Sequence, residues 1–204
     1  LDITNYKKSF NYIKKIRPKF LIHAAALSRP MSIHDKNINK SININIVGTC
    51  NIVKICSKLK IKLIFFSTNY VYPSKSGIYN EDDSVLPRNT YAWSKLGAES
   101  AVQMYKNSLI LRICMTEKPF VHKKAFANMK TNFMFQENLA KNLYKLINLK
   151  GIINVGGEIQ SVYNFAKKYN SKVKKIFASK SQQKQFPLNS TMNISKFNKV
   201  VKKK

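Results

Sequence analysis

The sequence predicts an α/β fold built on a doubly wound parallel sheet, with a small substrate-binding lobe towards its C-terminal end. Apolar runs at 19–25, 62–67 and 108–114 have the length and composition of buried strands. Between the first two lies a stretch, 42–59, whose apolar residues recur at the spacing of an amphipathic helix. Buried strands that alternate with amphipathic helices are typical of a parallel sheet with right-handed crossover connections.

Ordinary start and stop signals bound these elements. The first four residues resemble the end of a strand, and Thr4 or Asn5 can cap a helix that stops before Pro18. Turn-forming residues fill 71–90, and a loop of this length in a compact fold is usually functional. Residues 116–135 favour neither helix nor strand. The predicted elements are helix 6–16, strand 19–25, helix 42–59, strand 62–67, helix 91–105, strand 108–114, helix 137–149, strand 151–157, helix 161–168 and a short terminal helix.

A chain of 204 residues with an apolar content of 44% can bury a core of its own. No apolar run reaches the roughly 18 residues of a membrane span, and no signal-peptide pattern opens the chain. We therefore expect a cytoplasmic protein without a membrane partner. The three cysteines form no Cys-x-x-Cys pair, which indicates packed thiols. His34 and His122 have no carboxylate or cysteine at ligand spacing, so no metal is expected.

The chain is strongly basic, with 37 lysines and arginines against 9 acidic residues and a formal net charge of +28. A field of that sign can attract nucleic acid or a phosphorylated ligand. Lysine, asparagine and isoleucine are abundant together, however, which indicates a compositional bias, and the lysines are scattered along the sequence. The basic aromatic platforms of RNA-binding modules are not recognisable. We expect no nucleic-acid partner; the alternative predicts binding that weakens steeply with salt.

The strongest functional signal is a tyrosine four residues before a lysine, Tyr91 and Lys95, at the start of a predicted helix. Residues four apart lie on one helical face. A tyrosine phenol has a pKa of about 10, so it needs a nearby cation to work as an acid or base at neutral pH. Lys95 is placed to supply that cation. Thr68, just after strand 62–67, would then hold the oxygen that is protonated.

This constellation resembles the catalytic set of the short-chain dehydrogenase/reductase superfamily, in the extended branch that acts on nucleotide sugars. The likeness covers nearly the whole chain. The alanines at 24–26 resemble the strand end where the cofactor approaches the backbone, and the run from Asn45 to Thr49 resembles the Asn-x-x-Gly-Thr helix motif, whose asparagine is structural. The runs most similar to dTDP-4-dehydrorhamnose reductases are 67–72, 151–157 and 186–196.

The resemblance implies a Rossmann-like oxidoreductase that uses NAD(P)H to reduce a nucleotide-linked 4-keto sugar. Tyr91 would protonate the substrate carbonyl oxygen, while Lys95 would lower the tyrosine pKa and bind the nicotinamide ribose. Thr68 would donate a hydrogen bond to the reacting oxygen, and Thr68 and Asn69 would face the sugar. The residues that would bind the cofactor, NAD or NADP, are Asp2, Ile3, Ala24, Ala25, Ala26, Tyr91 and Lys95.

The same resemblance implies a division of the chain into two parts. Residues 1–114, continued by 150–170, would form the cofactor-binding domain, and residues 115–149 with 171–204 would form the substrate lobe. Long helices such as 42–59 commonly pair in this superfamily, so a homodimer is an open alternative.

Three departures from the family pattern change the expectation. The Gly-x-x-Gly-x-x-Gly phosphate loop is absent, so we expect the later two thirds of a reductase, without the first βαβ unit and inactive by itself. Asn69 stands where the family has aspartate, and Met115 lies near the position of a family tryptophan, which would reshape the sugar pocket. The alternatives are a nucleotide-sugar epimerase or dehydratase, and a non-catalytic subunit like the regulatory subunit of methionine adenosyltransferase.

Other polar and aromatic residues have simpler interpretations. His23, at a strand end, is expected to be structural, and Trp93 to pack against the core. The acidic run 81–83 could receive a basic partner but is more typical of a solvated loop. Arg112 lies inside an apolar strand, where a buried charge needs a partner, and the sequence leaves a structural ion pair and a substrate phosphate both open.

Overall fold

A computed structural model describes residues 1–202 of the chain, which divide into two compact units. The first unit comprises Leu1–Ser67, Thr90–Leu111 and Ile147–Ile152. The second unit comprises Thr68–Asn89, Arg112–Leu146 and Ile153–Lys204. Both are assembled from segments that lie far apart in the sequence.

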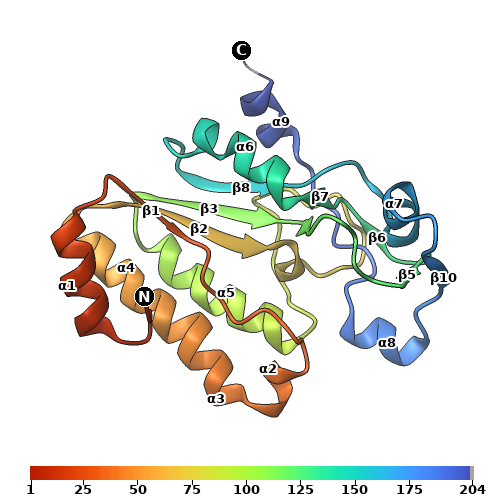
Figure 1. The fold of residues 1–204 in the computed structure, drawn as a ribbon, viewed down its shortest axis with the longest axis horizontal. Coiled ribbons are helices and arrows are strands. Elements are labelled where there is room, and N and C mark those ends of the chain that lie inside the picture. The colour runs from red at the N-terminus through yellow and green to blue at the C-terminus, as the bar shows by residue number, and fades with distance from the viewer. Residues whose placement is uncertain (203–204) are drawn as a thin grey trace. The chain divides into compact units, whose positions relative to one another are not determined.

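The central sheet has four strands in the order β1-β2-β3-β8, running in parallel (Figure 1). The pairing of β1 with β2 places Phe20 beside Lys62 and His23 beside Phe65. The predicted α/β fold with a parallel sheet is therefore confirmed. The four strands are β1 (Phe20–His23), β2 (Lys62–Thr68), β3 (Ser108–Ile113) and β8 (Gly151–Val155).

The first helix, α1 (Tyr6–Ile16), has the predicted bounds. The side chain of Asn5 caps it by accepting a hydrogen bond from the backbone N–H of Lys8 at 3.0 Å. Arg17, in the left-handed conformation at φ 48°, ends it immediately before the proline. Residues 3 and 4 form a turn, so the predicted strand end at 1–4 is wrong. A local contact stabilises this turn: the Asp2 carboxylate accepts a hydrogen bond from the backbone N–H of Thr4 and holds the turn closed.

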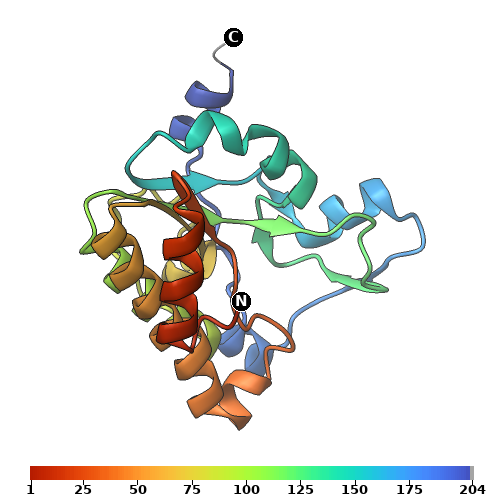
Figure 2. The same ribbon diagram turned by 60° about the vertical axis from the view of Figure 1, so that its left-hand side comes forward.

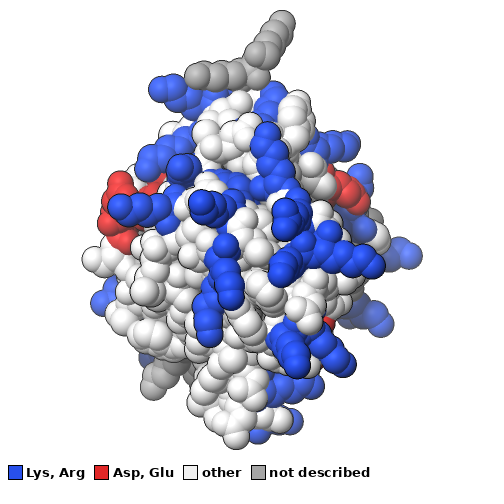
Figure 3. Space-filling model, turned by 90° about the vertical axis from the view of Figure 1, so that its left-hand side faces the viewer, with Lys and Arg blue, Asp and Glu red and all other residues white. Residues whose placement is uncertain are grey.

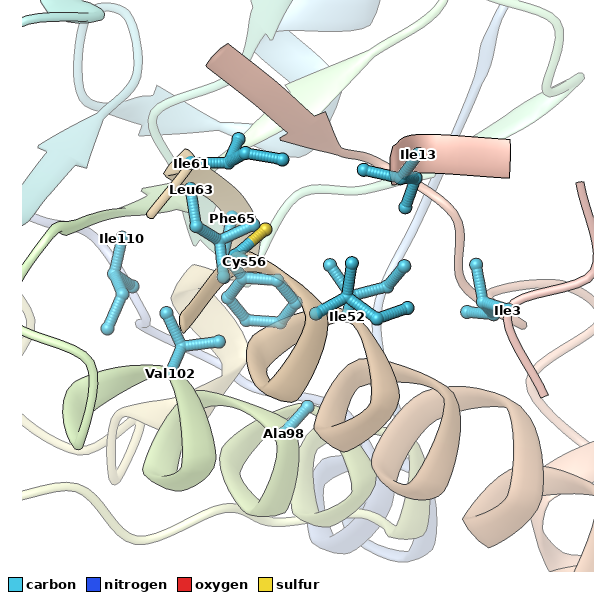
Figure 4. Packing of buried hydrophobic residues seen from close by; sticks show 11 residues of the cluster. Ile3, Ile13, Ile52, Cys56, Ile61, Leu63, Phe65, Ala98, Val102 and Ile110 are labelled. Carbon is cyan, nitrogen blue, oxygen red and sulfur yellow. The ribbon is translucent and has the colours of Figure 1, made fainter. Parts of the chain in front are cut away.

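Helices of the first unit bury their apolar faces in one cluster. Figures 1 and 2 both show α1 beside α4 (Gly48–Leu59), and α4 also packs against α5 (Thr90–Gln103). Leu63 and Phe65 of β2 point towards Cys56 of α4 and Val102 of α5 (Figure 4). Each fully buried side chain of this kind contributes about 1.5–3 kcal/mol to stability.

The predicted helix 42–59 is not continuous α-helix. It begins with α3 (Ile38–Ser41), passes through a π-helical segment, η1 (Ile42–Val47), and continues as α4. Such segments are rare and often lie at functional sites. The wider turn coincides with buried Asn45, whose side chain bonds to two other segments. Apolar periodicity does not distinguish the two helix types, so the sequence could not reveal this segment.

The second unit is built around a smaller aromatic core that includes Phe120, Phe135 and Phe165. Residues 116–135, where no element could be predicted, supply strand pairs of only two or three residues, and α8 and β10 were not predicted. The elements of this unit are η2 (Asn69–Val71), β4 (Met115–Thr116), β5 (Lys124–Phe126), β6 (Lys130–Thr131), β7 (Met134–Phe135), α6 (Gln136–Leu146), β9 (Gln160–Ser161), α7 (Val162–Tyr169), β10 (Lys174–Ile176), α8 (Lys180–Gln185) and α9 (Ser195–Val201).

A buried polar cluster in the second unit corrects one prediction and resolves another. Arg112 donates from Nη1 to the Tyr72 hydroxyl at 2.8 Å and to the Glu81 carbonyl at 3.0 Å, so its partners are structural. Glu81 is buried and accepts the backbone N–H of Asn154 at 3.1 Å. Its carboxylate also pairs with Lys196 at 3.1 Å. The prediction of a fully solvated acidic loop is thus wrong for Glu81, because this side chain turns inward to meet cations and amides.

Two further expectations concern exposure. Trp93 is 51% exposed, so the prediction that it packs against the core is wrong. Over residues 1–202, no helix is both long and apolar enough to cross a membrane.

Candidate active site

Tyr91 and Lys95 lie on one face of α5, and Glu99 continues that face one turn further. Tyr91 is partly buried, while Lys95 is only 4% exposed and Glu99 is fully buried. The start of the helix is fixed by Thr90, whose hydroxyl donates to the carboxylate of Asp35. The sequence prediction for Tyr91 and Lys95 noted their shared face, but missed Glu99 although it stands at the same spacing.

The Lys95 ammonium is held below the helix by two neighbours in β2. Nζ donates to the carbonyl oxygen of Phe66 at 2.7 Å and lies 4.2 Å from the ring centroid of Phe65. Burial lowers the pKa of Lys95 to about 7, and the carboxylate of Glu99 acts in the opposite direction. The charge of Lys95 therefore changes close to neutral pH.

Glu99 joins the same helix to the next residue of the strand. Its Oε2 accepts a hydrogen bond from the Ser67 hydroxyl at 2.6 Å. Lys95 and Glu99, one turn apart, thus bind Phe66 and Ser67, which are consecutive in β2. This clasp fixes the rotation of α5 against the strand, and with it the direction of the helical face that carries Tyr91.

Asn45 and Ser94 fix the first turn of α5 from the other side. Asn45 donates from Nδ2 to the Ser94 hydroxyl at 2.8 Å, and that hydroxyl donates to the Tyr91 carbonyl at 2.7 Å. The Asn45 side chain also pairs with both backbone groups of Leu27, in the loop after β1. The π-helical segment therefore carries the residue that links that loop to the tyrosine turn.

His34 packs against the tyrosine, which the sequence did not predict. Its ring centroid lies 5.2 Å from that of Tyr91, and Nδ1 shares a hydrogen bond with the Ser41 hydroxyl at 2.7 Å. The side chain is fully buried and Nε2 has no hydrogen-bond partner. Burial lowers the pKa of His34, which favours the neutral form of the ring beside Tyr91. No spacing in the sequence points to this contact.

Thr68 and Asn69 lie in the second unit. The Thr68 hydroxyl accepts the backbone N–H of Tyr70 at 3.2 Å and so begins the 3-10 turn that follows β2. The Asn69 amide donates to the hydroxyl of Ser190 at 2.6 Å and to its carbonyl at 3.2 Å. Both side chains are buried. The structure thus brings Tyr91 and Lys95 together in the first unit, and ties Asn69 to the C-terminal segment of the second.

Of the residues expected to bind a dinucleotide, some are engaged within the protein and others are exposed. Asp2 is engaged locally, because Oδ1 accepts from the N–H and hydroxyl of Thr4, which lowers the pKa of Asp2. Ile3 is buried against Gly48. The alanines at 24–26 follow β1 as an irregular stretch, with the first two exposed and the third half-buried. Their small side chains leave the backbone open to close approach by a ligand.

The three cysteines, which are further titratable residues, have structural roles. All three cysteines are free thiols; burial raises the pKa of Cys56 to about 12 and that of Cys114 to about 11, so neither is a reactive thiolate. Within residues 1–202, no group of three or more His, Cys, Asp and Glu side chains is arranged to hold a metal ion.

His23 is buried at the end of β1, where Nε2 shares a hydrogen bond of 2.9 Å with the Thr49 hydroxyl. Burial, followed by the charge of Lys95, lowers the pKa of His23 to about 3.

Between pH 6.5 and 3 the unfolded chain therefore binds a proton at His23 that the folded chain does not, so stability falls as the pH falls. As the pH is lowered across this window, we expect the free energy of unfolding of wild type to fall by on the order of 4 kcal/mol more than that of His23→Gln. Urea unfolding at a series of pH values measures it; parallel curves would contradict it.

A parallel α/β sheet with a Tyr-x-x-x-Lys helix beside it defines a protein of the short-chain dehydrogenase/reductase type. The chain belongs to the RmlD substrate binding domain family, whose sequence pattern matches residues 1–135. The predicted family is thereby confirmed.

Individual relatives agree with this assignment. A dTDP-4-dehydrorhamnose reductase from Aggregatibacter actinomycetemcomitans is 29% identical over 118 residues, which are 57% of this chain and 40% of that protein. Methionine adenosyltransferase 2 subunit beta from Xenopus laevis is 32% identical over 102 residues, which are 50% of this chain and 30% of that protein. The chain thus spans well under half the length of these curated relatives.

Solved structures show the same fold over nearly the whole chain. A hypothetical dTDP-4-dehydrorhamnose reductase from Sulfolobus tokodaii superposes with a TM-score of 0.88 at 26% identity, over 99% of this chain and 81% of that one. A dTDP-4-dehydrorhamnose reductase from Bacillus anthracis, in complex with NADP, gives a TM-score of 0.85 at 24% identity, over 97% and 80%.

Proposed function

We propose that the intact protein carrying this chain is an NAD(P)H-dependent reductase of a nucleotide-linked 4-keto sugar. The observation that supports this most directly is the Lys95 clasp. A buried ammonium, one helical turn from Tyr91 and bonded to the strand below, is what a tyrosine acid needs in order to work near neutral pH. The matched family and the reductases among the similar proteins and solved structures support this function.

In this proposal each residue has one task. Tyr91 donates its phenolic proton to the substrate carbonyl oxygen, and the Lys95 ammonium stabilises the phenolate that remains. The Thr68 hydroxyl donates a hydrogen bond to the same oxygen as negative charge develops on it. A bound nicotinamide cofactor would supply the hydride. Asn69 faces the sugar only if its bonds to Ser190 open when substrate binds.

The residues present fit one end of a dinucleotide. Lys95 suits the nicotinamide ribose. The alanines at 24–26, of which Ala24 and Ala25 are exposed, suit a close approach of the cofactor to the backbone. The six glycines, by contrast, form no Gly-x-x-Gly-x-x-Gly loop, so no residue of this chain would cradle the pyrophosphate. We therefore expect the 204-residue chain alone to bind NAD(P) weakly and not to turn over. The division into a cofactor domain, 1–114 with 150–170, and a substrate lobe, 115–149 with 171–204, remains part of the proposal.

The test is the net consumption of reduced cofactor by the intact protein. With dTDP-4-dehydrorhamnose and NADPH or NADH, we expect one equivalent of cofactor to be oxidised per sugar reduced, followed by absorbance at 340 nm and by mass spectrometry of the sugar. Conversion of the sugar without net oxidation would indicate an epimerase or dehydratase. No conversion by a protein that binds cofactor would exclude both enzymes.

A second candidate is a non-catalytic regulatory subunit. The observation that favours it is the similarity to methionine adenosyltransferase 2 subunit beta, which is 32% identical over half of this chain. This candidate predicts that the intact protein forms a stable complex with a methionine adenosyltransferase catalytic subunit and changes its kinetics. Size-exclusion chromatography of the mixture detects such a complex, and the cofactor assay detects the reductase. The two measurements together distinguish the two functions.

A further inference from the structure

The amino ends of the parallel strands carry a concentrated basic surface. Two adjoining hollows, of about 370 and 280 Å³, lie there within the first unit and share two of their lysines. Among the described residues that line them, none is acidic. The cations of this basic edge are Arg17, Lys19, Lys58, Lys60, Lys62 and Lys150.

The lysines are scattered along the sequence, but the fold collects these six cations because α1, α4 and the turn before β8 all end at the same edge of the sheet. Figure 3 shows lysine and arginine side chains crowded on the side of the molecule where these helices end and the strands begin. The helix dipole accounts for a cation such as Lys58 in the last turn of a helix. It does not account for Lys19 and Lys62 at strand starts, or for Lys150.

Lys62 shows that this crowding has an energetic cost. Its side chain is buried, and Nζ donates one of its three hydrogens to the carbonyl of Leu149 at 2.6 Å. Burial lowers the pKa of Lys62, and the charge of Lys150 lowers it further. Two ammonium groups therefore repel each other across the second hollow, and an anion placed between them would relieve the repulsion.

The basic edge is separate from the proposed active site. Phe20 and Lys62, which line the second hollow, are the first residues of β1 and β2. The clasp of Lys95 holds Phe66 and Ser67, near the other end of β2. An anion bound at the amino ends therefore has no part in the reaction proposed above, and the following proposal does not depend on it.

We propose that the basic edge is a binding site for a small anion carrying several linked phosphate groups. The volumes of the hollows suit a small ligand. Lysine ammonium groups bind phosphate as point charges, and the Asn107 and Asn148 side chains that line the second hollow add neutral donors. Of the residue types with which proteins read nucleic-acid bases, the described lining of the two hollows has one arginine, Arg17, and the half-buried ring of Phe20, which lies under the Lys19 ammonium. A lining dominated by lysines favours a phosphate chain without bases.

Inorganic tripolyphosphate is the probe for this site. In isothermal titration calorimetry of the 204-residue chain at 0.15 M salt, we expect saturable binding of one tripolyphosphate per chain. The double variant K19Q/K150Q removes two exposed cations of the basic edge, and we expect it to weaken binding at least tenfold. The matched control K7Q/K36Q removes two other exposed lysines of the first unit, and we expect a change of less than twofold.

Four results would overturn the proposal. An equal loss in K7Q/K36Q would show that net charge alone attracts the anion. Non-saturable binding, or equal binding of sulfate at the same ionic strength, would show that no site for linked phosphates exists. Tight binding of single-stranded RNA that K19Q/K150Q abolishes and tripolyphosphate does not displace would assign the basic edge to a polymer instead. Unchanged circular dichroism and urea unfolding of both variants ensure that a loss of binding is not a loss of folding.

Discussion

Replacing Tyr91 with phenylalanine in the intact protein is expected to lower kcat for the sugar reduction by about 10²- to 10⁴-fold, the range for loss of a positioned general acid. The change removes one oxygen atom and keeps the ring against His34, so the packing of α5 should persist. Lys95 keeps its bonds to β2, because none of them involves the phenol. Affinity for the reduced cofactor should therefore change little. Steady-state kinetics and fluorescence titration of NAD(P)H measure the two effects separately.

The outcome of this substitution separates the proposed roles of the protein. A variant that keeps more than about a tenth of the wild-type kcat would show that Tyr91 is not the acid. Ala92→Ser, on the next position of the helix, is a poor control because Ala92 is fully buried. Trp93→Phe is better, since Trp93 is exposed on another face of α5, and its kcat should be within about twofold of wild type.

Much of the first unit could be predicted because its signals are local. The cap at Asn5 and the proline at 18 bound α1, and the apolar runs that become β2 and β3 are long enough to be buried strands. Tyr91 and Lys95 could be placed on one face because helical spacing alone determines it. Asn45 was expected to be structural from the family motif, and its bonds to Leu27 and Ser94 show what it holds.

The remainder depends on contacts between segments far apart in the sequence. Glu81 resembles a solvated loop residue until Arg112, Asn154 and Lys196 converge on its segment from distant positions. Strands of two or three residues, such as those within 115–135, are too short to show the alternation of side chains by which a strand is recognised in a sequence. The basic edge is likewise invisible in the sequence, because its cations come from three separate segments and only the fold brings them together.

Glu99 is the residue whose substitution should most affect the stability of the first unit. In Glu99→Gln the buried Lys95 ammonium loses its compensating negative charge, and removing one member of a buried pair costs about 3 kcal/mol or more. The cost should depend on pH. Burial lowers the pKa of Lys95 to about 7, and loss of Glu99 lowers it further, since this carboxylate is what raises it. Below pH 7 the wild-type protein keeps Lys95 charged because the Glu99 carboxylate offsets part of the cost of burying the ammonium, whereas the variant must either bury an unpaired charge or release a proton.

The sign follows from the protons bound by each state. Unfolded lysine stays protonated up to about pH 10.4, so wherever folded Lys95 is neutral the unfolded chain binds the extra proton and stability rises with pH. In wild type this rise begins near pH 7, and in the variant it begins lower. We therefore expect the deficit of Glu99→Gln, about 3 kcal/mol at pH 6, to narrow by about 1 kcal/mol by pH 9, measured by urea unfolding. Ser67→Ala, which removes only the hydrogen bond to the carboxylate, should cost about 1 kcal/mol at both pH values. An equal deficit for Glu99→Gln at pH 6 and pH 9 would mean that Glu99 acts through Ser67 alone and leaves the charge of Lys95 untouched.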